Sequence, residues 1–253
     1  MHPTASEQGG PTWATPGHTD LPTTRLPTPD LPLTDLPAAL RRTTGAQDAW
    51  WTVDSSFEIL LGCVLVQNTN WRNVERSLSL LRAAGITSPA RLLELNGAAL
   101  VPLVAPSGFQ RAKAQTLRAL CGWWVDEGDV EALETADLYA TTPLLPHLST
   151  AEIRKRLLVL RGIGPETADV LLLYLLGRGV FVADTYARRL LTHLGWDVPP
   201  GYHAFARHVQ QQMDLPLSGW QEFHALIDEF AKVHARTPED WAAGPLAGCR
   251  LST

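Results

Sequence analysis

The feature that most constrains this chain is a glycine hairpin between two helical stretches. Ser149 and Glu152 have the spacing of a capping box, so we expect a helix to begin there. This helix ends at Gly162, because glycine readily adopts the left-handed turn that closes a helix. Pro165 has its φ already set for a first helical turn, which predicts a second helix over residues 165–176. The sequence therefore predicts two helices joined by a tight hairpin.

The hairpin is suited to binding a phosphate group. Gly162 and Gly164 leave room for backbone N–H groups to approach an anion at the start of the second helix, and Ile163 points inward between them. The net charge of −5 is unusual for a nucleic-acid binder, but it is unevenly distributed. Residues 151–195 contain seven basic and four acidic side chains, whereas residues 1–40 contain one basic and four acidic ones. We therefore expect a nucleic-acid phosphate to bind at the hairpin.

Asp184 comes twenty residues after the hairpin and follows a short apolar run, residues 180–183. It precedes the helical stretch 185–194, so it is the expected N-cap of a third helix. Capping is a common role for aspartate, and the position alone indicates nothing more. The same carboxylate can both cap a helix and take part in catalysis.

The combination of hairpin and aspartate resembles a known family. Gly162, Ile163 and Gly164, followed at this spacing by the run 182–186 (Val-Ala-Asp-Thr-Tyr), are similar to the helix-hairpin-helix DNA glycosylases of the endonuclease III superfamily. In that family the catalytic aspartate stands directly before a helix, so the resemblance implies that Asp184 is catalytic. It also implies two helical subdomains with an active-site cleft between them, and double-stranded DNA containing a damaged base as the partner.

Further stretches are similar to one branch of this superfamily, the 3-methyladenine DNA glycosylase III enzymes. They are residues 50–51, 57–69, 106–109, 113–114 and 162–169, and the resemblance covers most of residues 36–241. It implies base-excision repair of alkylated purines, 3-methyladenine and 7-methylguanine among them, after the base is flipped out of the duplex. Two alternatives stay open: an endonuclease III-type enzyme for oxidised or mismatched pyrimidines, and a non-catalytic hairpin module that only binds DNA.

The chemistry requires a carboxylate beside the sugar. Cleavage of an N-glycosidic bond builds positive charge on the deoxyribose, which Asp184 would stabilise while it orients or deprotonates a water molecule. Glu166 stands where endonuclease III has its lysine nucleophile, and a carboxylate cannot form a Schiff base. We therefore predict a monofunctional enzyme without lyase activity. Glu166 is also assigned to the base pocket, with a first-turn acid at a helix N-terminus as the alternative.

Aromatic side chains are the predicted walls of the base pocket. Trp50, Trp51 and Trp71 flank the first predicted core helix. The resemblance implies that Trp51 and Trp71 are pocket residues with Trp50 beside them. We expect the rings of Trp51 and Trp71 to be opposing walls around a charged base. Core packing is the alternative for all three. Arg236 aligns near a basic pocket residue of the branch, which is a lysine there.

Further side chains are expected to hold the distorted duplex. By resemblance, Gln67 fills the gap left by the flipped base. Phe109 is the apolar wedge at the opposite strand, since inserted apolar side chains unstack and kink DNA. Core packing is the alternative for Phe109. Arg161 and Thr167 flank the hairpin glycines and are assigned to DNA binding together with them.

Helical periodicity dominates from residue 36 onward, and no convincing alternation predicts a sheet. We therefore expect an all-α fold with about ten helices. Besides those around the hairpin, the predicted helices span residues 56–67, 73–84, 88–95, 97–104, 111–128, 131–140, 202–213 and 221–234.

The predicted domain organisation has a tail and one domain. Eight of the nineteen prolines lie within or just after residues 1–35, and we expect this acidic segment to be disordered because it offers little apolar surface to bury. Residues 36–253 are the expected glycosylase domain. Within it, residues 53–194 would form a six-helix barrel subdomain with the hairpin, and residues 36–52 plus 195–253 a second helical subdomain.

The cysteine content argues against an iron–sulfur cluster. Such a cluster needs four cysteine thiolates, and this chain has three cysteines, Cys63, Cys121 and Cys249, far apart in the sequence. We predict no cofactor, with a monovalent cation at the hairpin carbonyls left open. No apolar run approaches the roughly 18 residues of a membrane span, and no signal peptide is recognisable. We expect a monomeric protein of the bacterial cytoplasm with no membrane partner.

Overall fold

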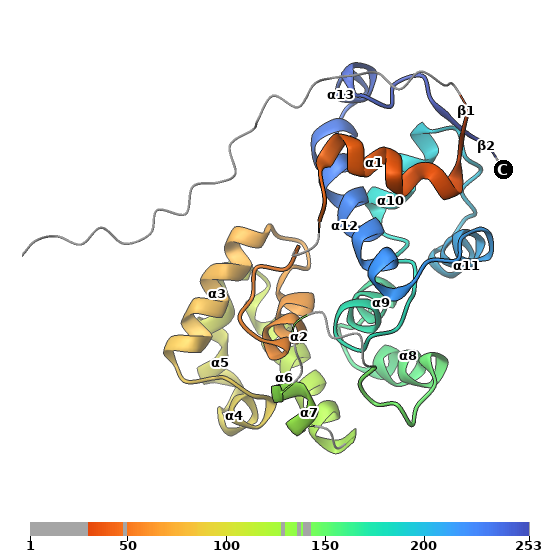
Figure 1. Cartoon of the computed structure of the whole chain (residues 1–253). Helices are drawn as coiled ribbons and strands as arrows, with labels where there is room; N and C mark the ends of the chain where they lie inside the picture. Colours follow the sequence, from red (N-terminus) through yellow and green to blue (C-terminus); the bar gives the residue numbers. More distant parts are fainter. Residues whose placement is uncertain (1–29, 48–49, 128–129, 136–137, 139–142, 253) are drawn as a thin grey trace, which may run out of the picture.

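The computed structural model describes residues 30–47, 50–127, 130–135, 138 and 143–252, and nearly all regular elements in this part are helices (Figure 1). The predicted all-α fold is confirmed. The helices are α1 (Leu36–Thr44), α2 (Ser56–Leu65), α3 (Trp71–Ala83), α4 (Pro89–Glu94), α5 (Gly97–Val104), α6 (Gln110–Glu127), α7 (Val130–Thr135), α8 (Thr150–Val159), α9 (Pro165–Tyr174), α10 (Thr185–His193), α11 (Tyr202–Gln212), α12 (Leu217–His234) and α13 (Pro238–Ala243). The other described elements are the 3-10 turns η1 (Leu33–Asp35) and η2 (Ala105–Ser107) and the strands β1 (Asp30–Pro32) and β2 (Arg250–Ser252).

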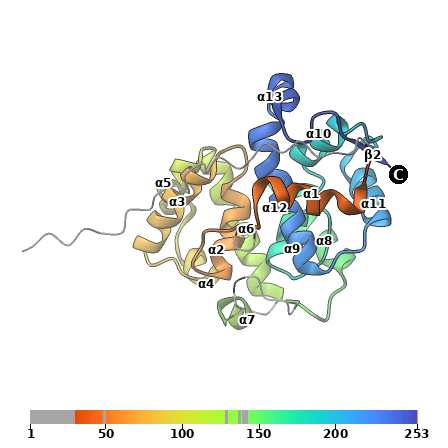
Figure 2. The same ribbon diagram turned by 45° about the horizontal axis from the view of Figure 1, so that its top comes forward.

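The helices form two groups that α9 joins (Figures 1 and 2). On one side α6 packs against α2, α4 and α5, and α3 packs against α2 and α5. On the other side α1 and α10 both pack along α12, and α13 contacts α12 as well. α9 contacts α2 of the first group and α12 of the second. The helix that follows the hairpin therefore lies where the two groups meet.

The predicted subdomain boundary at residue 194 groups α10 with the helices that precede it. In the structure α10 packs on α12, together with α1 (Figure 2). A boundary before α10 fits this packing better than one after it. The predicted catalytic aspartate at the start of α10 thus comes from the C-terminal group, while α9, the helix after the hairpin, contacts both groups.

Local sequence signals set the helix starts near the hairpin as predicted. The Ser55 side chain accepts a hydrogen bond from the backbone N of Glu58 at 3.3 Å at the start of α2. The predicted capping box of Ser149 and Glu152 is present at the start of α8. Gly162 has a φ of +86°, the left-handed conformation that glycine adopts readily. These contacts confirm the predicted helix, hairpin and helix.

Several helix bounds differ from the prediction. α12 begins at Leu217, one turn before the predicted start, and α1 and α13 are not among the predicted helices. α1 carries Pro37 in its first turn, where proline is tolerated. α13 begins with a capping box of Thr237 and Asp240, in which aspartate replaces the usual Glu or Gln. The predicted helix 131–140 is described only as α7, and most of its remainder falls outside the described residues.

Residues 30–35 are folded, which corrects both the predicted extent of the tail and the predicted absence of a sheet. β1 pairs in parallel with β2, with Leu31 opposite Leu251. Leu31 and Leu33 are buried in the core. The two strands come from opposite ends of the described chain, so no local periodicity could reveal their pairing. Residues 1–29 of the predicted tail lie outside the described part.

A chain that begins at residue 36 should melt roughly 6–24 °C below one that begins at residue 30, because it loses two buried leucines. Each buried leucine contributes about 1.5–3 kcal/mol, and each kcal/mol corresponds to about 2–4 °C in a domain of this size. Calorimetry of the two chains measures the difference. The double variant Leu31→Ala/Leu33→Ala in the full chain is the matched control and should show a similar drop. Equal melting of the two shortened chains would contradict a stabilising role for this segment.

Candidate active site

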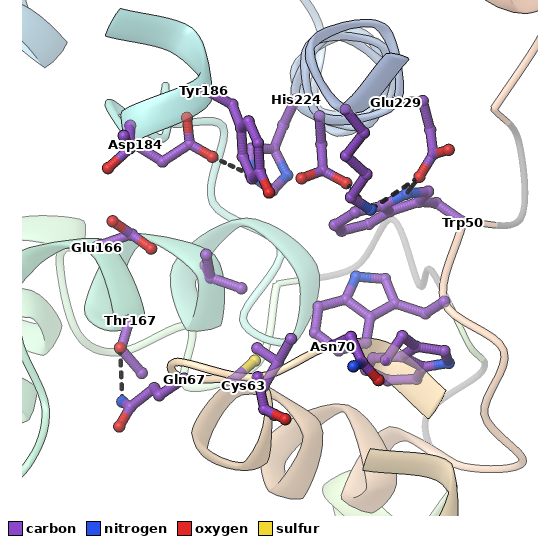
Figure 3. Close-up of a pocket in the computed structure, with 18 of the residues that line it drawn as sticks. Trp50, Cys63, Gln67, Asn70, Glu166, Thr167, Asp184, Tyr186, His224 and Glu229 are labelled. Atoms are coloured by element: carbon purple, nitrogen blue, oxygen red, sulfur yellow. Dashed lines mark hydrogen bonds and ion pairs between the residues drawn. The ribbon is translucent and has the colours of Figure 1, made fainter. Parts of the chain in front are cut away.

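A pocket of about 800 Å³ lies between the two helix groups (Figure 3). It is lined by the segment before α2, the loop from α2 to α3, the start of α9, the start of α10 and one face of α12. Asp184, Glu166, Trp50, Trp51 and Trp71 all line it. The structure therefore brings the predicted catalytic aspartate and most of the predicted pocket side chains into one cavity.

Asp184 combines a structural cap with access to the pocket. Its Oδ1 accepts a hydrogen bond from the backbone N of Ala187 at 2.7 Å, which makes it the N-cap of α10 as predicted. Its Oδ2 lies 3.7 Å from Nε2 of His224 (Figure 3). Only 8% of the residue is exposed. Water screens a buried charge weakly, so this carboxylate acts strongly on any positive charge that develops beside it.

Glu166 lies in the first turn of α9 and shares the pocket with Asp184 (Figure 3). Loss of surrounding water raises the pKa of Glu166, and the negative charge of Asp184 raises it further, while His224 opposes the shift. Glu166 therefore holds a proton more readily than an ordinary glutamate. Its position agrees with both interpretations, a first-turn acid and a pocket residue.

The tryptophans are packed edge to face. The ring of Trp51 lies 5.1 Å from that of Trp71 with an interplanar angle of 85°, and 5.6 Å from that of Trp50 at 82°. A base stacked between two walls needs parallel rings about 7 Å apart, twice the contact distance of carbon atoms. The expectation that Trp51 and Trp71 are opposing walls is therefore wrong for this structure. Trp51 is buried, whereas Trp50 and Trp71 are half-buried and can present a face to the cavity.

Gly62 in α2 explains why these rings sit so close to the helix. A Cβ atom at this position would lie 2.8 Å from the ring of Trp51 and 3.2 Å from that of Trp71. Real Cβ atoms do not approach rings so closely without a shift of one partner. The absence of a side chain at Gly62 therefore lets both indoles rest on α2.

Gln67 connects the loop after α2 to the hairpin. Its Nε2 donates to the carbonyl of Gly162 at 3.1 Å and to Oγ1 of Thr167 at 2.9 Å. Ile163 is buried, as its predicted inward position requires, whereas Gly164 is exposed. Arg161, next to the hairpin, is also exposed. Of these residues, Gln67 and Thr167 line the pocket, and Arg161 and Gly164 are exposed. Their roles in DNA binding stay predictions.

Phe109 projects into solvent. It is 67% exposed with a φ of +46° and follows Gly108, whose φ is +72°. This exposure rules out core packing for Phe109. The buried Lys113 donates from Nζ to the carbonyls of Ser107 at 2.6 Å and Leu65 at 2.8 Å, which ties the loop to the end of α2. The geometry suits an apolar wedge, and that role stays a prediction.

Arg236 is exposed and does not line the pocket, which corrects its predicted place. The basic side chain of α12 that lines the pocket is Lys232, four residues before Arg236, and it reaches Asp228 at 2.5 Å and Glu229 at 3.1 Å. The nitrogen of Lys232 lies 5.8 Å from the ring of Trp50. The family resemblance had placed the basic pocket residue near Arg236, four residues after Lys232.

His224 was not among the predicted site residues, and it lines the pocket with Asp228 and Lys232. The three residues are spaced four apart, so they share one face of α12. A polar stripe on an otherwise buried helix is a signal that could have revealed them. Tyr186 and Arg189 from α10 line the same cavity and were missed too.

Acidic side chains outnumber basic ones around the cavity. The carboxylates are Glu166, Asp184, Asp228 and Glu229, against the basic side chains of Arg189 and Lys232 and the imidazole of His224. Counted with a neutral imidazole and all four carboxylates ionised, four acids and two bases give a formal charge of −2. The cavity therefore favours a positively charged occupant over a neutral one of the same shape.

A family profile matches the part of the chain that carries the site. Residues 61–213 match the HhH-GPD superfamily base excision DNA repair proteins. The chain belongs to this superfamily. The matched region contains the hairpin and Asp184, and this HhH-GPD protein is a base excision repair DNA glycosylase.

Individual relatives agree with the assignment. A candidate DNA repair glycosylase of Methanocaldococcus jannaschii is 31% identical over 189 residues, which cover 74% of this chain and 81% of the relative. The fold is similar to that of the H. pylori 3-methyladenine DNA glycosylase MagIII bound to 1,N6-ethenoadenine, with 27% identity and a TM-score of 0.62 over 80% of this chain and 98% of that one. A non-covalent endonuclease III–DNA complex shares the fold at 19% identity, with a TM-score of 0.62 over 86% of this chain and 92% of that one. DNA is the partner of this HhH-GPD glycosylase.

The cysteines of this glycosylase do not fit an iron–sulfur cluster. Cys63, Cys121 and Cys249 are all buried, and a cluster needs four thiolates. Burial raises the pKa of the Cys63 thiol, and raises that of Cys121 to about 12, so both stay protonated. Within the residues that the structure describes, no three His, Cys, Asp or Glu side chains are grouped to hold a metal ion.

The carbonyls of the hairpin already take part in hydrogen bonds. The carbonyl of Leu160 accepts from the backbone N of Ile163 at 3.1 Å, and that of Gly162 accepts from Gln67. Each carbonyl keeps a second lone pair, and a monovalent cation at this position stays a prediction. None of the described helices combines the length and the apolar character that crossing a bilayer requires.

Proposed function

We propose that this glycosylase hydrolyses the N-glycosidic bond of purines alkylated at N3 or N7 and leaves the DNA strand intact. The observation that carries this proposal is a cavity with a formal charge of −2 that three tryptophans line. A purine methylated at N3 or N7 is a cation. It is attracted by the carboxylates, and a cation over an indole face gains about 0.5–2 kcal/mol. The likeness to the H. pylori 3-methyladenine DNA glycosylase supports the same substrate class.

Asp184 supplies the charge that the reaction needs. As the bond to the base breaks, positive charge moves onto the sugar, and the buried carboxylate stabilises it. A cationic purine leaves as a neutral base, so no acid has to protonate it. The route therefore needs no proton from Glu166, although its pKa is raised. We assign Glu166 to the lining of the pocket beside Asp184.

A hydrolytic route also agrees with the state of the lysine in the cavity. Loss of water lowers the pKa of Lys232, but the charges and hydrogen bonds of Asp228 and Glu229 together outweigh this effect, and the pKa is raised overall. Lys232 is therefore held as an ammonium ion. An ammonium group has no lone pair with which to attack a sugar carbon, and Glu166 has no amine at all.

A panel of damaged duplexes tests the substrate class. Methylated DNA should release 3-methyladenine or 7-methylguanine as the free base, because these purines carry a positive charge. Duplexes with thymine glycol or mismatched thymine should release little. Chromatography of the released bases, together with abasic-site counting, measures both.

If the enzyme efficiently releases thymine glycol or mismatched thymine and does not act on methylated purines, an endonuclease III-type activity replaces this proposal. Binding without any release would point to a non-catalytic module.

Borohydride should trap no covalent complex between this enzyme and damaged DNA, because Glu166 stands at the position of the lysine nucleophile and Lys232 in the pocket is held as an ammonium ion. Strands should break only after alkali treatment. The matched variant Glu166→Lys places an amine at the position that endonuclease III uses, and it should form a trapped complex that gel electrophoresis detects. An efficient adduct with the unaltered protein would show that another amine attacks the sugar.

A further inference from the structure

His224 is a buried histidine that the proposed reaction does not yet use. It lies on α12, is 7% exposed and lines the pocket beside Asp184 (Figure 3). Its Nε2 is 3.7 Å from Oδ2 of Asp184. On its other side, Nδ1 is 2.8 Å from the hydroxyl oxygen of Tyr174, at the end of α9. A buried titratable group between these two partners has a defined orientation.

The contacts of Tyr174 define the tautomer of neutral His224. The Tyr174 hydroxyl donates to the carbonyl of Gln221 at 2.9 Å, and a carbonyl can only accept. The hydroxyl proton is therefore engaged, so the hydroxyl oxygen accepts from N–H at Nδ1 of His224. The proton of the neutral imidazole then resides on Nδ1, and Nε2 presents a lone pair to Asp184.

Two acceptors that face each other need a donor between them. Oδ2 of Asp184 and Nε2 of His224 cannot bond directly while the imidazole is neutral, and their separation of 3.7 Å agrees with that. A water molecule has two O–H donors, and hydrogen bonds of about 2.8 Å to both acceptors are compatible with this separation. The pair is therefore arranged to hold one water molecule at the edge of the cavity.

We propose that His224 is a second catalytic residue, the base that takes a proton from the attacking water. This inference rests on the proposed hydrolysis. The bond between C1′ and the base nitrogen breaks, and its electron pair leaves with the base. The water oxygen forms a bond to C1′, one proton passes to Nε2 of His224, and the other stays on the new sugar hydroxyl. Asp184 takes up no proton in this step, and its negative charge stabilises the sugar cation throughout.

The surroundings of His224 stabilise the imidazolium that this step forms. Asp184 at the start of α10, Glu166 from α9 and Asp228 one turn along α12 are carboxylates that interact with His224. Tyr174 accepts from Nδ1, and the half-buried Trp50 faces the ring edge to face at 5.2 Å. An imidazole that is protonated before the reaction cannot accept a proton, and it also neutralises Asp184. Base release should therefore fall toward acidic pH.

The test is the single-turnover rate of free-base release across pH, on a duplex that the unaltered enzyme excises. His224→Gln keeps a polar side chain without a base, and it should be about 100-fold slower, with its acid-side decline lost. His147→Gln, at an exposed position outside the pocket, is the matched control and should equal the unaltered protein. DNA affinity and melting temperature of His224→Gln should stay close to those of the control.

Tyr174→Phe is a second, independent test of the inference in case His224→Gln folds poorly. Without the Tyr174 hydroxyl, the imidazole proton can move to Nε2, where the N–H donates to Asp184, so release should slow about 10-fold with His224 still in place.

If His224→Gln folds, stays within about threefold of the unaltered rate and keeps the acid-side decline, the inference is overturned while the proposed hydrolysis stands. If His224→Gln does not fold, an unaltered rate in Tyr174→Phe overturns it. If the unaltered enzyme forms a borohydride-trapped adduct, the hydrolysis and the inference fail together.

Discussion

Replacing Asp184 with asparagine should lower base release by a factor of at least about 100 while DNA binding is retained. The asparagine side chain still offers an oxygen to the backbone N of Ala187, so α10 keeps its cap. Only the negative charge is lost, and with it the stabilisation of the sugar cation. Single-turnover release from methylated DNA and binding to an undamaged duplex measure the two effects separately.

Asp35→Asn is the matched control for this substitution. Asp35 precedes α1 as Asp184 precedes α10, but it is exposed, its side chain caps nothing, and it does not line the pocket. Its replacement should leave base release unchanged. Near-normal turnover by Asp184→Asn would remove Asp184 from the catalytic role, whatever the melting temperature of the variant.

Gly162→Ala should destabilise the protein by roughly 2–4 kcal/mol and weaken DNA binding by about tenfold or more. The φ of +86° at Gly162 is strained for any residue with a side chain, and a Cβ there would overlap the hydroxyl of Thr116 in α6. Relief of this overlap has to move the hairpin, whose Gly162 carbonyl also binds Gln67. Thermal unfolding and titration of a labelled duplex measure the two losses.

Gly85→Ala separates backbone strain from the effect on the hairpin. Gly85 has a φ of +74° after α3, and a Cβ there meets nothing within 4 Å. This control should lose about 1–2 kcal/mol from the left-handed backbone alone and bind DNA normally. If both variants lost the same stability and both bound DNA normally, the hairpin would tolerate a side chain at Gly162.

The hairpin and the N-cap at Asp184 were predictable from sequence because their signals are local. A capping box at Ser149, a left-handed glycine at Gly162 and a cap at Asp184 each depend on residues within one turn. The composition of the chain likewise argued against an iron–sulfur cluster, since three cysteines are too few. Local rules of this kind operate before any long-range packing forms.

The arrangement inside the pocket depends on contacts between distant segments. The edge-to-face packing of Trp51 and Trp71 on Gly62 contradicts the walls expected from their order in the chain. Arg236 lies beyond the end of α12 at His234, whereas Lys232 lies within α12 and lines the pocket.

The helix-hairpin-helix, the cap at Asp184 and the mainly helical class follow from local sequence, because neighbouring residues encode turns, caps and periodicity. The pairing of β1 with β2 and the 3.7 Å separation of His224 and Asp184 follow instead from long-range packing. These contacts join segments that no local pattern relates. The packing of α9, α10 and α12 fixes the distance and orientation at which their side chains meet.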